Sequence, residues 1–330
     1  MAATPLTLTP LEPDLAAALG ALPPRPGVGQ ILGPEGKNLV IGRAANLRRW
    51  AAGHLGQGRP AAKGRRPRTD LRPVAKAVRW AGTTSAFHQR LVYERLMAEH
   101  VKAEARRDLK PTAYIHLDTE ERFPRLSVRG PDAPPRNLFG PFRDRRAAAR
   151  AIEALHKLLP LRPCDFTFEP AVDLALGLGC LYAQVRTCAA PCLVRASEED
   201  YRALAVQAHA LLSRPEERTA EVASWAPPWV AAVSGARGLV VEKARDAIEL
   251  YPVREGAVLE EASVRVGEGG LAEAVDRLRW PLPDPPRDDR RWLSAWLHAP
   301  RRTGEYLVVD DGGDTRGLAQ RIARVTDVVT

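Results

Sequence analysis

The sequence lacks two features that would place the protein at or across a membrane. No apolar run approaches the length of a membrane span. The N-terminus also has no basic segment followed by an apolar core, which is the pattern of a secretory signal. We therefore expect a cytoplasmic protein with no membrane partner.

Cysteine is scarce, and its few copies lie together. The 330 residues include four cysteines, Cys164, Cys180, Cys188 and Cys192, with fifteen, seven and three residues between them. In a reducing compartment such clustering indicates a metal site before disulfides. Four thiolates suit either tetrahedral zinc or a [4Fe–4S] cluster. Structural zinc usually takes its ligands in close pairs, and only the last spacing here is short, so the spacing slightly favours iron–sulfur. Four buried apolar cysteines, or a disulfide pair, are the alternatives.

Acidic residues are outnumbered by basic ones. The chain carries 49 Lys and Arg against 40 Asp and Glu, for a formal net charge of +9 and a pI of about 9.7. Most of the basic residues are Arg, whose planar guanidinium suits phosphate. A polyanionic partner would explain this balance. A GC-rich genome, which inflates Arg, Ala and Pro, would produce it as well.

The first hundred residues predict a hairpin, a basic loop and a helix. Apolar runs at 27–32 and 38–42 flank Gly33-Pro34-Glu35-Gly36, a composition typical of a turn between antiparallel strands. A helix is expected after Asn46, and an amphipathic helix from Ser85 to about Arg107. Between these helices, residues 57–79 hold eight basic residues and a single acid, Asp70, and predict a mobile basic loop in their first half. We expect residues 1–20 to be a loosely attached, flexible leader.

The remainder predicts two further units. Strands are expected at 114–117 and 125–128, and helices from Asp144 and Ser197. The first of these helices is predicted to bury Ala148, Ile152, Leu155 and Leu159, and the second to bury Tyr201, Leu204, Ala208 and Leu211. From about residue 216, runs at 238–242, 247–253 and 258–266 predict a small antiparallel sheet. Helical stretches at 271–278 and 291–297 and a strand at 306–309 complete this unit.

Motifs from residue 138 to 213 resemble a known family. The runs "FGPFRDRRAAARAIEALHKLLPLRPC" and "CLYAQVRTCAAPCLVRASEEDYRALAVQAHALLS" are similar in content and order to the N-terminal half of the UvrC/Cho excinuclease family. The likeness extends over about residues 22–215. It implies that the four cysteines bind a [4Fe–4S] cluster, with zinc as the alternative, and that the N-terminal part has a GIY-YIG nuclease fold. The family's helix-hairpin-helix pair and second nuclease domain have no counterpart here.

The residue patterns and the resemblance together predict an α+β fold with four units. A flexible leader (1–20) precedes a GIY-YIG-like domain (21–107), in which helices flank a small antiparallel sheet. A helical four-cysteine region (108–215) and a small accessory α+β domain (216–330) follow.

Most positions that carry the family's chemistry are altered. Phosphodiester cleavage needs a base, a cation and a carboxylate that holds a metal. By resemblance, the family's two tyrosines fall on Gly29 and Val40, and its helical arginine falls on Trp50. The cation position falls on Arg43, and the metal-binding carboxylate on Glu94. Arg43 and Glu94 are therefore remnants of a site that has lost its proton-transfer groups.

We accordingly expect a DNA-binding protein of nucleotide excision repair with little or no incision activity. It would act with the damage-recognition excinuclease subunits. The alternative is an active endonuclease that uses Mg or Mn in a site rebuilt around His88, Tyr93 or Glu94. A third hypothesis is that the protein is a redox or scaffold module. The predicted DNA-binding residues are Arg43, Arg48, Arg49, Arg65, Arg66 and Arg68.

Overall fold

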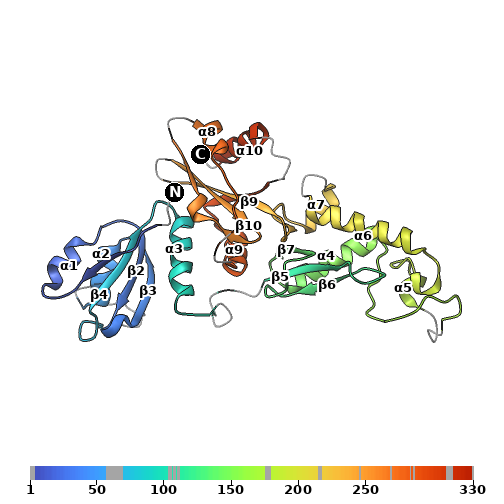
Figure 1. Ribbon diagram of the computed structural model, residues 1–330, viewed down its shortest axis with the longest axis horizontal. Helices are drawn as coiled ribbons and strands as arrows, with labels where there is room; N and C mark the ends of the chain where they lie inside the picture. The colour runs from blue at the N-terminus through green and yellow to red at the C-terminus, as the bar shows by residue number, and fades with distance from the viewer. Residues whose placement is uncertain are drawn as a thin grey trace.

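Three antiparallel sheets and their helices make up the protein, which confirms the predicted α+β class. The computed structural model describes residues 4–56, 70–102, 106, 109, 112–174, 180–214, 218–244, 247–267, 270–282, 284, 287–309 and 315–328. Figure 1 shows the first sheet at one end, the second with its helices at the other, and the third between them. No helix within these ranges is both long and apolar enough to span a membrane.

The first sheet contains the predicted hairpin. Its strands lie in the order β1-β4-β2-β3. They are β1 (Thr7–Pro10), β2 (Gly27–Leu32), β3 (Asn38–Ala44) and β4 (Ala77–Gly82). The turn between β2 and β3 is the short 3-10 helix Pro34–Gly36, where Gly36 has a φ of 74°, a conformation that glycine adopts without strain. The strand register places Gly29 opposite Gly42 and Ile31 opposite Val40.

The N-terminal residues are part of this sheet, so the prediction of a loosely attached leader is wrong. Strand β1 pairs with β4, and Asp14 caps helix α1 (Leu15–Ala21) by accepting the N–H groups of Ala16 and Ala17. Leu19 and Leu22 are buried in the core beneath the sheet. Strand β1 and helix α1 are too short for their sequences to show a clear hydrophobic period. Residues 77–79, at the end of the basic stretch 57–79, belong to strand β4. Residues 57–69, which include the predicted mobile first half, lie outside the described part of the chain.

Helices cover both faces of the first sheet. Helix α2 (Leu47–His54) begins at Asn46, which accepts the N–H of Arg49, and packs with α1 on one face. Helix α3 (Ala86–Ala98) begins at Ser85 as predicted and packs on the other face through Val92 and Leu96. It ends at Ala98 rather than near residue 107.

The second sheet is formed by the middle region, residues 108–215, together with residues 220–232, which were predicted to belong to the C-terminal domain. Its strands β5 (Ala113–Asp118), β6 (Arg125–Arg129), β7 (Leu138–Phe142) and β8 (Ala231–Ala232) lie in the order β6-β5-β7-β8. Its helices are α4 (Arg145–Leu158), α5 (Leu181–Gln184), α6 (Glu198–Ser213) and α7 (Ala220–Trp225). Helices α4 and α6 begin where predicted, and Asp144 and Ser197 cap them by accepting the N–H groups of Ala147 and Asp200. On α6, Ala205 and Leu212 are buried, whereas the predicted Leu204 and Leu211 are only half-buried, because the buried stripe is displaced by one residue.

The C-terminal region, residues 216–330, contains the third sheet. Strands β9 (Arg237–Lys243), β10 (Ile248–Arg254), β11 (Ala257–Val258) and β13 (Gly304–Val309) lie in the order β11-β10-β9-β13, and β12 (Val264–Val266) also pairs with β10. The run predicted as one strand at 258–266 is therefore two strands separated by a 3-10 turn, Glu260–Ala262. Helices α8 (Gly270–Asp276) and α10 (Thr315–Val328) cover one face of the sheet, and α9 (Arg290–Leu297) covers the other.

Helix α3 joins the first and third sheets, between which it stands in Figure 1. Its residues Phe87 and Leu91 pack in one core with Val240 and Tyr251 of the third sheet. Both carboxylate oxygens of Glu242, on β9, accept the N–H of Phe87 at 2.9 Å. The C-terminal region thus buries the side of α3 that faces away from the first sheet.

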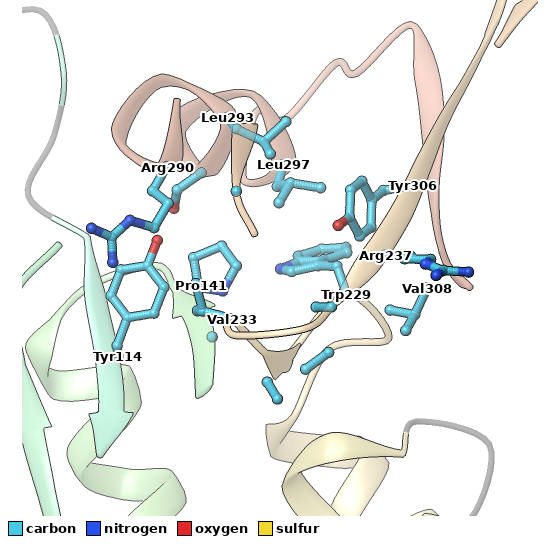
Figure 2. A pocket seen from close by; sticks show the side chains of 16 residues that line it. Tyr114, Pro141, Trp229, Val233, Arg237, Arg290, Leu293, Leu297, Tyr306 and Val308 are labelled. Carbon is cyan, nitrogen blue, oxygen red and sulfur yellow. The ribbon is translucent and has the colours of Figure 1, made fainter. Parts of the chain in front are cut away.

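The middle and C-terminal regions meet at a second interface, shown in Figure 2. A small cavity of about 40 Å³ lies there between Tyr114 and Pro141 of the middle sheet and Leu293 and Tyr306 of the C-terminal region. The Arg290 guanidinium lies 6.0 Å from the Tyr114 ring centroid and donates to the carbonyl of Ala133. These contacts attach the C-terminal region to both other parts of the chain.

Candidate nucleic-acid interface

On one face of the first sheet, a tryptophan covers Gly29, one of the positions singled out by the resemblance. A Cβ atom added to Gly29 would lie 2.3 Å from Cζ3 of Trp50, and one added to Gly42 would lie 2.6 Å from Nε1 of the same indole. Gly29 and Gly42 are register partners, so both glycines lie beneath one ring. The Trp50 indole therefore occupies the space that a side chain at position 29 would need.

The rest of this face is apolar. Trp50 is 9% exposed and lies in one core with Ile31 and Leu47, against which Val40 also packs. His54 meets the indole edge to face, with ring centroids 5.2 Å apart. Gly29, Val40 and Trp50 are thus brought together as packing residues, and none of the three can transfer a proton.

The opposite face carries charge. Arg43 is opposite Val28, whose side chain packs against α3, so Arg43 projects on the α3 side of the sheet. Its guanidinium lies 5.4 Å from the ring centroid of Tyr93, and those of Arg90 and Arg106 lie 5.9 and 5.7 Å from the same ring. Three guanidinium groups thus surround one phenol, an arrangement favoured by cation–π attraction.

Glu94 lies beside this group and is engaged by two of the arginines. Its carboxylate accepts Nη1 of Arg106 at 2.7 Å and pairs with Arg90 at 2.5 Å, and its side chain is 5% exposed. Three guanidiniums with one carboxylate leave a net positive charge. The sequence prediction missed Arg90 and Arg106, and the only available signal was the position of Arg90 four residues before Glu94.

His88, considered as a replacement base, is held in a buried network. Its Nε2 is 2.7 Å from the Thr4 hydroxyl, and its Nδ1 is 2.8 Å from the Thr84 hydroxyl. Glu260 of the C-terminal region also faces His88, at 3.8 Å. Burial by itself raises the pKa of Glu260, but hydrogen bonding to His88, the charge of Arg95 and the bonds from Thr4 outweigh it and lower this pKa to about 2. Both ring nitrogens of His88 therefore have partners.

The predicted DNA-binding arginines have different surroundings. Arg48 donates to the carbonyls of Leu22 and Gly20, at 2.9 and 2.7 Å, and so caps the end of α1. Arg49 on the same helix is exposed, as is Arg43. Arg65, Arg66 and Arg68 lie outside the described residues.

The four cysteines are free thiols in one part of the middle region. Cys188 and Cys192 are buried, and Cys164 and Cys180 are half-buried. Burial, together with the proximity of the other three sulfurs, raises the pKa of Cys188 to about 11, although the N–H of Ala190 partly opposes this shift. Among the described side chains, however, no group of three or more His, Cys, Asp or Glu is arranged to hold a metal ion. The thiols are neighbours, and in this arrangement they do not form a ligand set.

Comparison with known proteins supports the resemblance for part of the chain. Residues 112–211 match the middle domain of the UvrC/Cho excinuclease family. Among curated relatives, the UvrABC system protein C of Methylococcus capsulatus is 28% identical over 200 residues, which are 59% of this chain and 31% of the relative. That of Rhodospirillum rubrum is 31% identical over 204 residues, 60% of this chain and 30% of the relative. That of Novosphingobium aromaticivorans is 32% identical over 208 residues, again 60% and 30%.

These matches cover about three-fifths of this chain and less than a third of the relatives' length. No solved structure matches. The matched segment includes all four cysteines. It also includes helix α4 and most of helix α6, which pack in the core of the second sheet. Residues 112–211 are therefore similar to the middle domain of the UvrC/Cho excinuclease family, and the likeness to UvrABC system protein C extends over about three-fifths of the chain.

Proposed function

We propose that the protein is a DNA-binding member of the nucleotide excision repair machinery whose own incision activity is lost or much reduced. The observation that carries the proposal is the Trp50 indole over Gly29 and Gly42. By resemblance, positions 29, 40 and 50 would supply two phenols and a guanidinium. Here they supply an apolar contact, which cannot activate water or stabilise a phosphorane.

Retained positive charge supports the DNA-binding part of the proposal. The chain has a formal net charge of +9, and Arg43 and Arg49 are exposed at the end of the hairpin and on α2. Such groups bind phosphate backbones without sequence preference and make affinity dependent on salt. The names of the relatives, UvrABC system protein C, support a partnership with other excinuclease subunits.

The second candidate is an active metal-dependent endonuclease with a rearranged site. The observation in its favour is that Tyr93, Glu94 and Arg43 lie close together on the α3 side of the sheet. A phenol, a carboxylate and a guanidinium are the groups that such chemistry requires. Against it, both carboxylate oxygens of Glu94 already accept Arg106, and the side chain is buried.

One experiment separates the two candidates. The full-length protein, prepared anaerobically, is incubated with an end-labelled duplex that carries one lesion, with Mg or Mn, and with or without damage-recognition subunits. Glu94→Gln and Tyr93→Phe variants are run beside it. We expect duplex binding and no metal-dependent incision by any of them. Incision by the wild type that disappears in both variants would establish the second candidate instead.

We also propose that Cys164, Cys180, Cys188 and Cys192 hold a [4Fe–4S] cluster, with zinc as the alternative. The mutual proximity of the four sulfurs and their lack of disulfides support this assignment. Loading would require deprotonation of the thiols and a closer approach of the sulfurs than the present arrangement has. Cys188→Ser is expected to lower both the iron content and the melting temperature of anaerobically purified protein. Unchanged values for both would refute the assignment.

A further inference from the structure

A second cavity lies where the three regions of the chain meet. It has a volume of about 470 Å³, within the usual range for ligand pockets. The N-terminal region, the middle region and the segment Ser294–Thr303 of the C-terminal region all contribute to its wall. Its polar lining includes Arg43, Arg90, Thr112, Arg143, Ser294 and Arg301.

The cavity is strongly basic. Arg43, Arg143 and Arg301 are exposed, and within the described ranges none of the three forms a salt bridge. No described Asp or Glu lines the cavity. His298 adds no charge near neutral pH, because burial lowers its pKa. Cations that converge without a counter-charge repel one another, and this cost is relieved by a bound anion.

The wall also contains an aromatic ring and a hydroxyl. The Trp296 ring is half-buried, with its edge fixed against Phe87 at a centroid distance of 4.9 Å. The guanidinium of Arg302 lies 5.5 Å from the same ring. The Ser294 hydroxyl is fully buried and has no hydrogen-bond partner among the described residues. Arginines beside an aromatic ring suit a phosphate joined to a planar base.

We propose that this cavity binds a nucleotide unit of single-stranded nucleic acid. Arg43, Arg143 and Arg301 contact its phosphate, and the base lies against Trp296. The inference rests on the proposed DNA-binding function and adds two points to it. The strand is unpaired where it enters the cavity, and the C-terminal region completes the binding site.

The test compares strand types and matched variants of the full-length protein. Fluorescence anisotropy measures binding of a labelled 15-mer oligothymidylate and of a duplex of equal length, over a range of salt concentrations. The variants are Arg143→Ala/Arg301→Ala and, as control, Arg324→Ala, which removes an exposed arginine from α10. We expect the double variant to bind the single strand at least tenfold more weakly. The slope of its log affinity against log salt should fall by about 1.4, since each single-strand phosphate contact contributes about 0.7. The control should match the wild type.

A second measurement reports on the base. Oligothymidylate should quench tryptophan fluorescence in the wild type and less so in Trp296→Phe, which preserves the packing against Phe87. Single-strand affinity that is equal in the wild type and the double variant would overturn the inference while leaving the proposed function intact. Wild-type protein that binds neither DNA form would overturn both. If free thymidine monophosphate at its cellular concentration displaces the oligonucleotide completely, the inference is overturned, because the ligand of the cavity is then a free nucleotide and not a strand.

Discussion

The two faces of the first sheet differ in chemistry, because one is apolar and the other is charged. On the α2 face, Gly29 and Gly42 lie under the Trp50 indole in an apolar core. On the α3 face, Arg43, Arg90 and Arg106 surround Tyr93, and Glu94 is paired beside them. The same β2–β3 hairpin contributes to both faces. Its residues on one side are apolar or lack a side chain, and those on the other side include the charged Arg43.

This difference shows how one small sheet can combine an apolar face with a charged one. On the apolar face, a large aromatic ring over two glycines supplies the buried contact area. The charged face is stabilised differently, by the largely buried ion pairs of Glu94 with Arg90 and Arg106. We expect substitutions on the first face to affect stability alone, and substitutions on the second to affect stability and binding.

Removal of the indole should have the largest effect. Trp50→Ala leaves a cavity over Gly29 and Gly42, and we expect a loss of about 4 kcal/mol in unfolding free energy. Chemical denaturation measures it. Arg49→Ala, an exposed neighbour on the same helix, is the control and should change stability by less than about 0.5 kcal/mol. A loss below about 1 kcal/mol in Trp50→Ala would show that the ring is not a core residue.

The charged face should be sensitive to loss of its buried carboxylate. Glu94→Gln leaves the buried guanidinium of Arg106 and the largely buried one of Arg90 without their counter-charge, and we expect a loss of about 3 kcal/mol. Denaturation of Glu99→Gln provides the comparison. Glu99 pairs with Arg79 but is half exposed, so its loss should cost at most about 1 kcal/mol. Equal effects of the two substitutions would contradict the assignment of Glu94 as a buried structural anion.

Acid should weaken the attachment of the C-terminal region to α3. The pKa of Glu260 is lowered from 4.5 to about 2, so its stabilising contribution is complete above about pH 4.5 and is lost as the pH falls towards 2. Since one pKa unit corresponds to about 1.4 kcal/mol, up to about 3 kcal/mol is involved. Unfolding free energies of the wild type and Glu260→Gln, measured between pH 6 and 3, should converge on acidification. Glu273→Gln alters an exposed carboxylate, so its unfolding free energy should change with pH in parallel with that of the wild type.

The smallest expected effect tests the contact between the glycine and the ring. Gly29→Ala places a Cβ 2.3 Å from Cζ3 of Trp50, and we expect a loss of about 2 kcal/mol from overpacking. In a Trp50→Ala background the same change should cost almost nothing. Gly20→Ala, in α1, meets no atom within 4 Å and should leave stability unchanged or raise it by up to about 1 kcal/mol. A Gly29→Ala effect that persists without the indole would mean that the glycine is required for another reason.

Local signals in the sequence located most elements of the fold. The caps Asn46, Ser85, Asp144 and Ser197 begin the helices that they predict, because a side-chain oxygen satisfies the first free N–H groups wherever the helix lies. The hairpin at 27–44 was likewise predictable from the composition of its turn. Strand β1, by contrast, has four residues and depends on pairing with β4, about seventy residues away, which no local pattern reveals.

The candidate site was predictable only in part. Resemblance identified positions 29, 40, 43, 50 and 94 as altered or retained, but not that Trp50 would cover both glycines. Arg90 and Arg106 were missed because their relation to Tyr93 depends on side-chain packing. The cavity that includes Arg43, Arg143 and Arg301 combines residues from three regions, separated by 100 and 158 positions.

The sequence by itself determined the α+β class, the helix starts, the clustered cysteines, the excess of positive charge and the absence of phenols at positions 29 and 40. These follow from composition, short-range hydrogen bonding and aligned motifs, which need no knowledge of distant contacts. Only the tertiary structure decided that α3 lies between two sheets, that Glu94 and His88 already have partners, and that three arginines converge on one cavity. Such outcomes depend on the packing of residues far apart in the chain, because burial and proximity, rather than residue type, determine which charge is paired and which is available to a ligand.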